Sequence, residues 1–221
     1  AFGLVTLVAA VQSVLAFRIG VVLIGFGGGL FAVGGLTAAT FILPAHAANG
    51  YRAYAEAMRQ LSERYPDDLD AATLYAESLM DLRPWNYWTR DMQPYPETVE
   101  VMKILESVLA RNPNHPGAIH LYIHSVEYAR PELAEAGAER LRKLAPGAGH
   151  LVHMPSHIFR RVGRYDDASR SNQDAILADE DYIEQCRAQG VYPLAYYPHN
   201  IHFLWDSATM EGRSLVAIES A

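Results

Sequence analysis

The fold predicted for this chain rests on one short stretch, Gly163-Arg164-Tyr165-Asp166-Asp167-Ala168. The glycine suits a tight turn between two helices, and the tyrosine follows two positions later. Small residues then recur at Ala168, Asn172 and Ala175, where helices can cross closely. Pro113 and Pro146 lie 33 residues apart, and each ends the second helix of a predicted pair. The spacing therefore predicts helix pairs of about 34 residues, which stack because one pair cannot bury its apolar face.

Amphipathic stretches separated by short breaks fill the chain from residue 50 to residue 221. No alternating pattern of useful length predicts a strand, so the fold class is all-α, a solenoid of antiparallel helix pairs resembling tetratricopeptide (TPR) repeats. An irregular helical bundle with coincidental spacing is the alternative, and the periodic prolines favour the solenoid. The expected helices are 51–64, 70–82, 98–110, 115–128, 131–144, 149–162, 165–178, 198–210 and 213–219.

Two segments interrupt this predicted pattern. Residues 84–97 are aromatic and rich in proline, as in Pro84-Trp85-Asn86-Tyr87-Trp88. Loops of this length in a compact solenoid commonly cover a groove, so this loop is the predicted lid. A second insertion, over 181–196, separates the last two helix pairs.

Residues 1–47 differ from the rest, because Arg18 is their one formal charge. The uncharged run 19–43 is long enough, as a helix, to cross a hydrocarbon core of about 30 Å. An uncleaved membrane anchor is one interpretation, and a secretory signal ending at Ala45-His46-Ala47 is another. A gene-model or fragment artefact is the third, because the sequence lacks an initiator methionine. The first two place the remainder at a membrane surface or outside the cytoplasm, in the periplasm of a bacterium.

Charge and cysteine content exclude several functions. The formal net charge of −7 and the lack of a basic stripe argue against a nucleic-acid partner. Cys186 is the single cysteine, so neither an intrachain disulfide nor a thiolate metal cage can form. No Ser/His/Asp triad, phosphate loop or haem-attachment motif is present.

The histidines follow the predicted repeat. His150-x-x-His153-x-x-x-His157 is matched 49 residues later by His199-x-x-His202-x-x-x-Asp206. Two further histidines stand 33 residues upstream of His153 and His157. One repeat position is thus filled by His120, His153 and His202, and the next by His124, His157 and Asp206.

Residues spaced by three and seven positions share one helix face, and first helices line the concave side of a TPR-like stack. The histidines should therefore converge in the groove, where imidazole suits zinc, copper or iron. The set exceeds what one tetrahedral zinc ion needs, so it has room for two ions. The candidate ligands are His120, His124, His150, His153, His157, His199, His202, Asp206, Glu127 and Glu77.

A packing role for the repeated histidines is the alternative to metal binding. Buried imidazoles need polar partners, however, and several unpaired ones would be costly. His115 follows Asn112-Pro113-Asn114 and is expected to start a helix rather than bind metal.

From residue 67 to residue 205 the sequence resembles a bacterial group of TPR-repeat proteins with histidine-rich repeats. The family is named for its repeats, so the resemblance implies the fold rather than an activity. Its members usually carry further helical repeats upstream, where this chain has the apolar segment 1–47. The segments that carry the resemblance are Leu82-Arg83-Pro84-Trp85, Asn114-His115-Pro116-Gly117, Tyr122-Ile123-His124, His150-Leu151-Val152-His153-Met154-Pro155-Ser156-His157-Ile158 and Tyr196-Tyr197-Pro198-His199-Asn200.

Two functions follow as expectations. The first is a metal-binding protein or metal-dependent enzyme, in which Glu127 or Asp206 is the candidate base and the loop 84–97 is the lid. The second is a TPR scaffold tethered to a membrane through residues 1–47, which holds a protein or peptide partner in its groove. Its histidines would then be polar contacts sensitive to pH.

Overall fold

The computed structural model describes the backbone of residues 44–221 and the side chains from residue 49 onward. The predicted anchor or signal over 1–47 therefore lies almost wholly outside the described residues. The all-α class is confirmed for residues 49–221, where the only β-type pairing is a single bridge between Trp88 and Pro94. None of the helices in this described part combines the length and apolar character needed to cross a bilayer.

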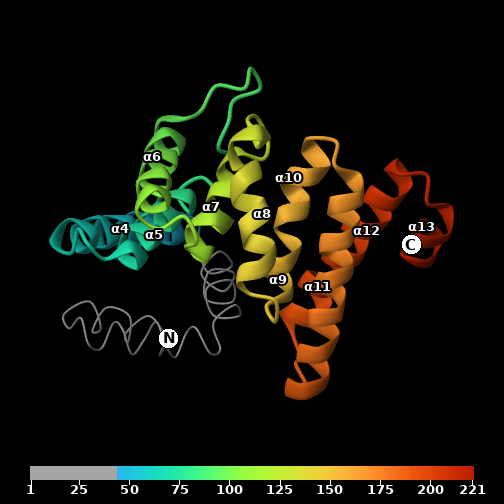
Figure 1. Ribbon diagram of the computed structural model, residues 1–221. Helices are drawn as coiled ribbons and strands as arrows, with labels where there is room; N and C mark the ends of the chain where they lie inside the picture. Colours follow the sequence, from blue (N-terminus) through green and yellow to red (C-terminus); the bar gives the residue numbers. More distant parts are fainter. Residues whose placement is uncertain (1–43) are drawn as a thin grey trace.

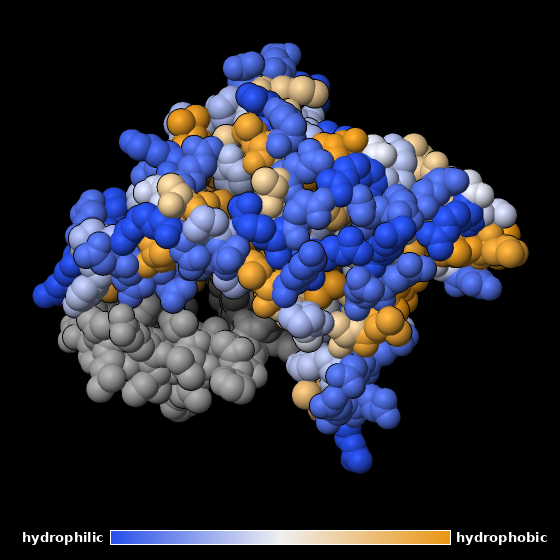
Figure 2. All heavy atoms as spheres, in the orientation of Figure 1, coloured by the Kyte–Doolittle hydropathy of each residue, from blue (hydrophilic) through white to orange (hydrophobic). Residues whose placement is uncertain are grey.

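The helices follow one another along the molecule, and most pack against their neighbours in the chain (Figure 1). Polar side chains cover most of the face in Figure 2, with apolar patches between them. The elements are α4 (Pro44–Arg64), α5 (Leu69–Met80), α6 (Pro96–Arg111), α7 (Pro116–Val126), the 3-10 turn η1 (Pro131–Ala134), α8 (Glu135–Leu144), α9 (Gly149–His153), α10 (Pro155–Arg161), α11 (Tyr165–Cys186), the π-helical turn η2 (Tyr192–Tyr196), α12 (Tyr197–Met210) and α13 (Ser214–Glu219).

Three departures from the predicted helix boundaries bear on the site or on the domain boundary. The helix predicted over 149–162 is divided into α9 and α10 at Pro155, which has no N–H to donate to the preceding turn. Helix α11 runs on to Cys186, so the first part of the predicted insertion 181–196 is helical. Helix α4 begins at Pro44, whose ring favours the first turn, and so crosses the predicted domain boundary at residues 47–50.

The core lies between the helices and is made of fully buried apolar side chains. Leu105 of α6, Ile119 and Ile123 of α7, and Phe159 of α10 are each at most 1% exposed. They belong to one continuous cluster that runs from α4 to α11. Burial of this kind stabilises by about 2 kcal/mol for each large side chain, so the core fixes how α7 and α10 face each other.

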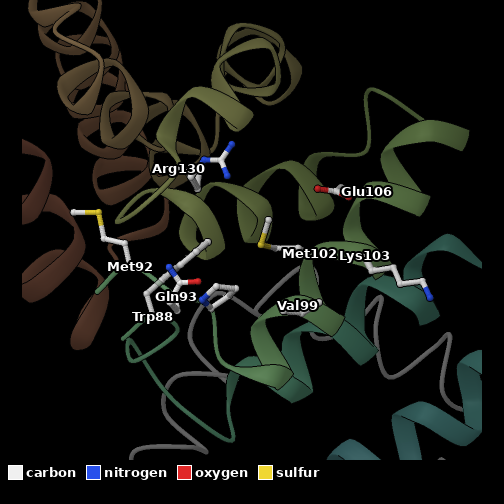
Figure 3. A pocket seen from close by; sticks show the side chains of 9 residues that line it. Trp88, Met92, Gln93, Val99, Met102, Lys103, Glu106 and Arg130 are labelled. Atoms are coloured by element: carbon white, nitrogen blue, oxygen red, sulfur yellow. The ribbon is translucent and has the colours of Figure 1, made fainter. Parts of the chain in front are cut away.

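The loop between α5 and α6 is fastened to α7. The indole N–H of Trp88 donates to the backbone carbonyl of Ser125 over 2.7 Å, and Thr98 donates to the carbonyl of Tyr87 over 2.6 Å. A cavity of about 400 Å³ lies on one side of this loop, and its lining includes Trp88 together with Val99 and Met102 of α6 (Figure 3). These contacts hold the loop beside the helix that carries His120 and His124.

Candidate metal centre

Six of the predicted histidines form two groups of three. The ligand atoms within each group lie within 4.8 Å of one another. Each trio contains two histidines four positions apart, which is about one helical turn. The third histidine comes from a helix later in the chain. The first trio is His120 and His124 of α7 with His150 of α9, and the second is His153 of α9 and His157 of α10 with His199 of α12.

The second trio has ring nitrogens whose protonation is fixed by acceptors. Nδ1 of His153 lies 2.6 Å from Oδ1 of Asn172, whose amide nitrogen donates to the carbonyl of Ala168. Nδ1 of His157 lies 2.6 Å from a carboxylate oxygen of Glu127. Both Nδ1 atoms therefore carry the proton, and the two Nε2 lone pairs face each other at 2.9 Å. Two facing lone pairs repel unless a cation or a further proton lies between them.

The first trio is built in the same way but is less fully supported. Nε2 of His120 and Nε2 of His150 lie 3.3 Å apart. His124 uses its Nδ1 to reach a carboxylate oxygen of Glu127 at 2.9 Å, which leaves its Nε2 for a metal. Nδ1 of His150 is buried and has no hydrogen-bond partner among the described residues. An orphaned buried nitrogen is costly, so this trio is incomplete as a purely hydrogen-bonded cluster.

Glu127 joins the two trios. Its Oε1 accepts from His124 and its Oε2 accepts from His157, so one carboxylate orients one imidazole in each group. Burial acts to raise the pKa of Glu127, but the hydrogen bonds from the two histidines outweigh it and hold the pKa well below its usual value. A carboxylate that accepts from the far nitrogen of a metal-binding histidine is the usual outer partner of a zinc site.

Five histidines of the cluster are held in the neutral form. Burial, reinforced by neighbouring imidazoles, lowers the pKa of His150 to about 3 and that of His199 to about 4. Burial is likewise the largest cause that lowers the pKa of His120, His124 and His153. Near pH 7 these five rings each keep one unprotonated nitrogen, which is the form that binds metal.

A buried polar network positions His199. Asn200, the next residue, donates its amide N–H to Oδ2 of Asp179 over 2.7 Å, and the Tyr192 hydroxyl donates to Oδ1 over 2.5 Å. Asp179 and Asn200 are fully buried. The network therefore fixes the start of α12 against α11, and with it the direction of the His199 side chain.

Gly149 makes room for this network. A Cβ atom at residue 149 would stand 1.9 Å from Oδ1 of Asp179 and 2.9 Å from the carbonyl oxygen of Ala175. We expect Gly149→Ala to lower the free energy of unfolding by about 1–3 kcal/mol, because a buried carboxylate must move. Gly147→Ala is the matched control, since nothing lies within 4 Å of its added Cβ. Urea unfolding of both variants checks the difference, and equal stabilities would contradict the role given to Asp179.

Four predicted ligands lie outside both trios. One of them, Glu127, forms a further group with His124 and His157, and the other three have partners of their own. His202 is exposed and stacks on Trp205, with ring centroids 5.4 Å apart. Asp206 accepts hydrogen bonds from Arg160 at both of its oxygens. Glu77 accepts the hydroxyl of Tyr54 over 3.0 Å. Among the described residues, none of these three, His202, Asp206 and Glu77, belongs to a group of three possible ligands.

Glu77 and Asp81 instead form a buried acidic pair. Burial, together with the neighbouring carboxyl of Asp81, raises the pKa of Glu77 to about 7, and burial raises that of Asp81 to about 6. The folded protein therefore holds protons that the unfolded chain releases near pH 4.5, and stability falls as the pH rises from about 4.5 to 7. We expect Glu77→Gln to remove about 1–2 kcal/mol of this fall. Urea unfolding at pH 5 and pH 8 tests it, and parallel pH dependences of variant and wild type would contradict it.

His115 stands apart from the cluster, as the sequence predicts. It begins α7 and accepts the backbone N–H of Ala118 on Nδ1 over 3.1 Å. Its other nitrogen lies 3.1 Å from a carboxylate oxygen of Asp70. Both ring nitrogens are thus occupied in holding the start of the helix.

Several supporting residues were not predicted. Asn172 is recognisable in sequence only as a small residue of the repeat, although it orients His153. Asp179 lies just beyond the end of the predicted helix 165–178, and it orients α12 through Asn200. Trp85 packs edge-on against His124 with ring centroids 5.1 Å apart, whereas the sequence predicts only that it belongs to the lid. No protein-family model matches the chain, and neither curated proteins nor solved structures show a significant match to it.

Proposed function

We propose that this chain is a TPR-like helical repeat protein that binds two transition-metal ions, one in each histidine trio. The observation that carries the proposal is the shared construction of the trios. The pair His120 and His124 recurs 33 residues later as His153 and His157, and the third ligands His150 and His199 lead the same spaced motif. A packing accident would not be expected to recur in the same positions.

The repeat extends to the contacts around the trios. Glu127 lies three residues after His124 and contacts His157 on the next first helix. Arg160 lies three residues after His157 and contacts Asp206 on the helix after that. Equivalent positions thus meet in both places, as a carboxylate with an imidazole and then as a guanidinium with a carboxylate. This supports a stack of like helix pairs.

Zinc fits the distances. Tetrahedral ligands at 2.0–2.1 Å from zinc lie about 3.3 Å from one another. The facing Nε2 atoms are 2.9 Å apart in the second trio and 3.3 Å apart in the first. Small rotations of the imidazoles therefore suffice to admit an ion. Copper and iron also bind imidazole, and competition between the metals ranks them.

Three protein ligands leave one position of a tetrahedral ion open, which is the arrangement of catalytic rather than structural zinc. We therefore propose a metal-dependent enzyme. The two residues predicted as bases have other partners, because both oxygens of Glu127 accept from histidines and both oxygens of Asp206 accept from Arg160. Glu127 would instead position the two sites, and a metal ion held by a trio would activate a water molecule in its open coordination position.

Metal titration tests the proposal. Chelator-treated protein titrated with zinc is expected to take up two ions per chain and to gain thermal stability, since a ligand that binds only the folded state stabilises it. His153→Ala should gain less, having lost one ligand. If zinc raises the melting temperature of the wild type no more than that of His153→Ala, and no zinc is retained, the proposal fails.

A further inference from the structure

A cavity of about 430 Å³ opens onto the histidine cluster from the side of the loop between α5 and α6. Its wall includes His124, a ligand of the first trio, and Glu127, the carboxylate that joins the two trios. Trp85 and Tyr87 of the loop and Arg161 at the end of α10 also line the cavity. A molecule in this cavity would therefore touch the metal-binding groups directly.

The charges around the cavity favour an anion once metal is bound. Two divalent ions held by six neutral imidazoles carry four positive charges, and Glu127 balances one of them. Arg160 is paired with Asp206, whereas Arg161 donates to the neutral backbone carbonyl of Tyr128. The surplus of positive charge lies next to an open coordination position, and a bound anion would reduce it.

The shape of the cavity narrows the class of anion. Trp85 and Tyr87 supply flat aromatic surface, and Trp85 holds a left-handed backbone with φ of 60° while its ring stands edge-on to His124. Arg161 supplies a planar fork that matches a carboxylate. A flat ring fits the aromatic wall, and a carboxylate fits the charged one.

We propose that this cavity binds a small organic carboxylate with a flat, aromatic body, whose carboxylate lies between Arg161 and the metal-bearing His124 wall. The inference rests on the proposed function for the charge of the ions, but the contribution of Arg161 is independent of it. The ligand is the substrate or product on which the bound metal acts.

Benzoate is the probe, and benzyl alcohol is the neutral control with the same ring. Calorimetry on zinc-loaded protein should show benzoate binding at least about tenfold more tightly, because charge-assisted hydrogen bonds are roughly twice as strong as neutral ones. Arg161→Gln should lose about tenfold in benzoate affinity and still hold two zinc ions. Arg170→Gln, at an exposed arginine of α11 outside the cavity, should match the wild type.

Measuring zinc in the same samples separates the two proposals. Two zinc ions per chain with no preference for benzoate, or with no loss in Arg161→Gln, would overturn the cavity proposal and leave the metal sites standing. Absence of zinc uptake would overturn the metal sites. If the protein takes up no zinc but binds benzoate in a way that depends on Arg161, the cavity proposal alone is supported. If it takes up no zinc and binds no benzoate, both proposals are overturned.

Discussion

Replacing His199 by alanine is expected to reduce the zinc bound per chain from two ions to one. His199 supplies the third ligand of the second trio, and the two that remain, His153 and His157, make a much weaker site. The first trio shares no ligand with the second and keeps its ion. Elemental analysis after dialysis against buffered zinc counts the ions directly.

His202→Ala is the matched control on the same helix. His202 is exposed and stacked on Trp205, outside both trios, so this variant should keep two ions. The sequence pattern gives His202 the same repeat position as His153. Comparing the two variants therefore shows whether zinc binding follows the repeat position or the contacts between helices. A loss of zinc in His202→Ala, with none in His199→Ala, would contradict the assignment of the second site.

Replacing Glu127 by glutamine is expected to weaken both zinc sites together, by about 10–100-fold in affinity, the effect usual for outer partners of metal ligands. The carboxylate accepts from Nδ1 of His124 and from Nδ1 of His157, whereas an amide offers only one acceptor oxygen. In the variant, either His124 or His157 must therefore lose its hydrogen-bond acceptor or change its tautomer. Competition with a chromophoric chelator measures both dissociation constants.

Glu132→Gln provides the comparison, because Glu132 is an exposed carboxylate paired with Arg130 away from the cluster. It removes the same charge and should leave zinc affinity unchanged. Weakening of one site alone in Glu127→Gln would show that Glu127 supports a single trio. Unchanged affinity at both sites would remove its joining role altogether.

The sequence predicts the helical class and the convergence of histidines, because both depend on the spacing of residue types along the chain. Proline and glycine end helices for local reasons, and a spacing of three to four residues places side chains on one face. Residues 149–162 show the limit of such rules, since Pro155 divides the predicted helix between two ligands of the second trio.

The grouping of the histidines could not be predicted from their equivalent positions in the repeat alone. Alignment puts His120, His153 and His202 at one position, but a metal ion needs residues that meet between neighbouring helices. The contacts combine two histidines four positions apart with the leading histidine of a later helix, His150 or His199. His202 and Asp206 are the repeat equivalents of the pair His153 and His157. Among the described residues, no histidine of a later helix joins them in a ligand group.

The supporting groups depend on packing that local sequence does not encode. Asp179 reaches the start of α12 because α11 continues past the predicted break, and Gly149 leaves the space that its carboxylate fills. Asn172 orients His153 across 19 residues of sequence. Such contacts appear only when the helices are placed in three dimensions.

Anomalous scattering from zinc-soaked crystals is the most direct test of the central claim. We expect two peaks at the zinc absorption edge, one bounded by Nε2 of His153 and His157 with His199, and one bounded by His120, His124 and His150. Glu127 should lie between the peaks, bonded to ring nitrogens rather than to metal. A single peak outside both trios, or none at saturating zinc, would contradict the account.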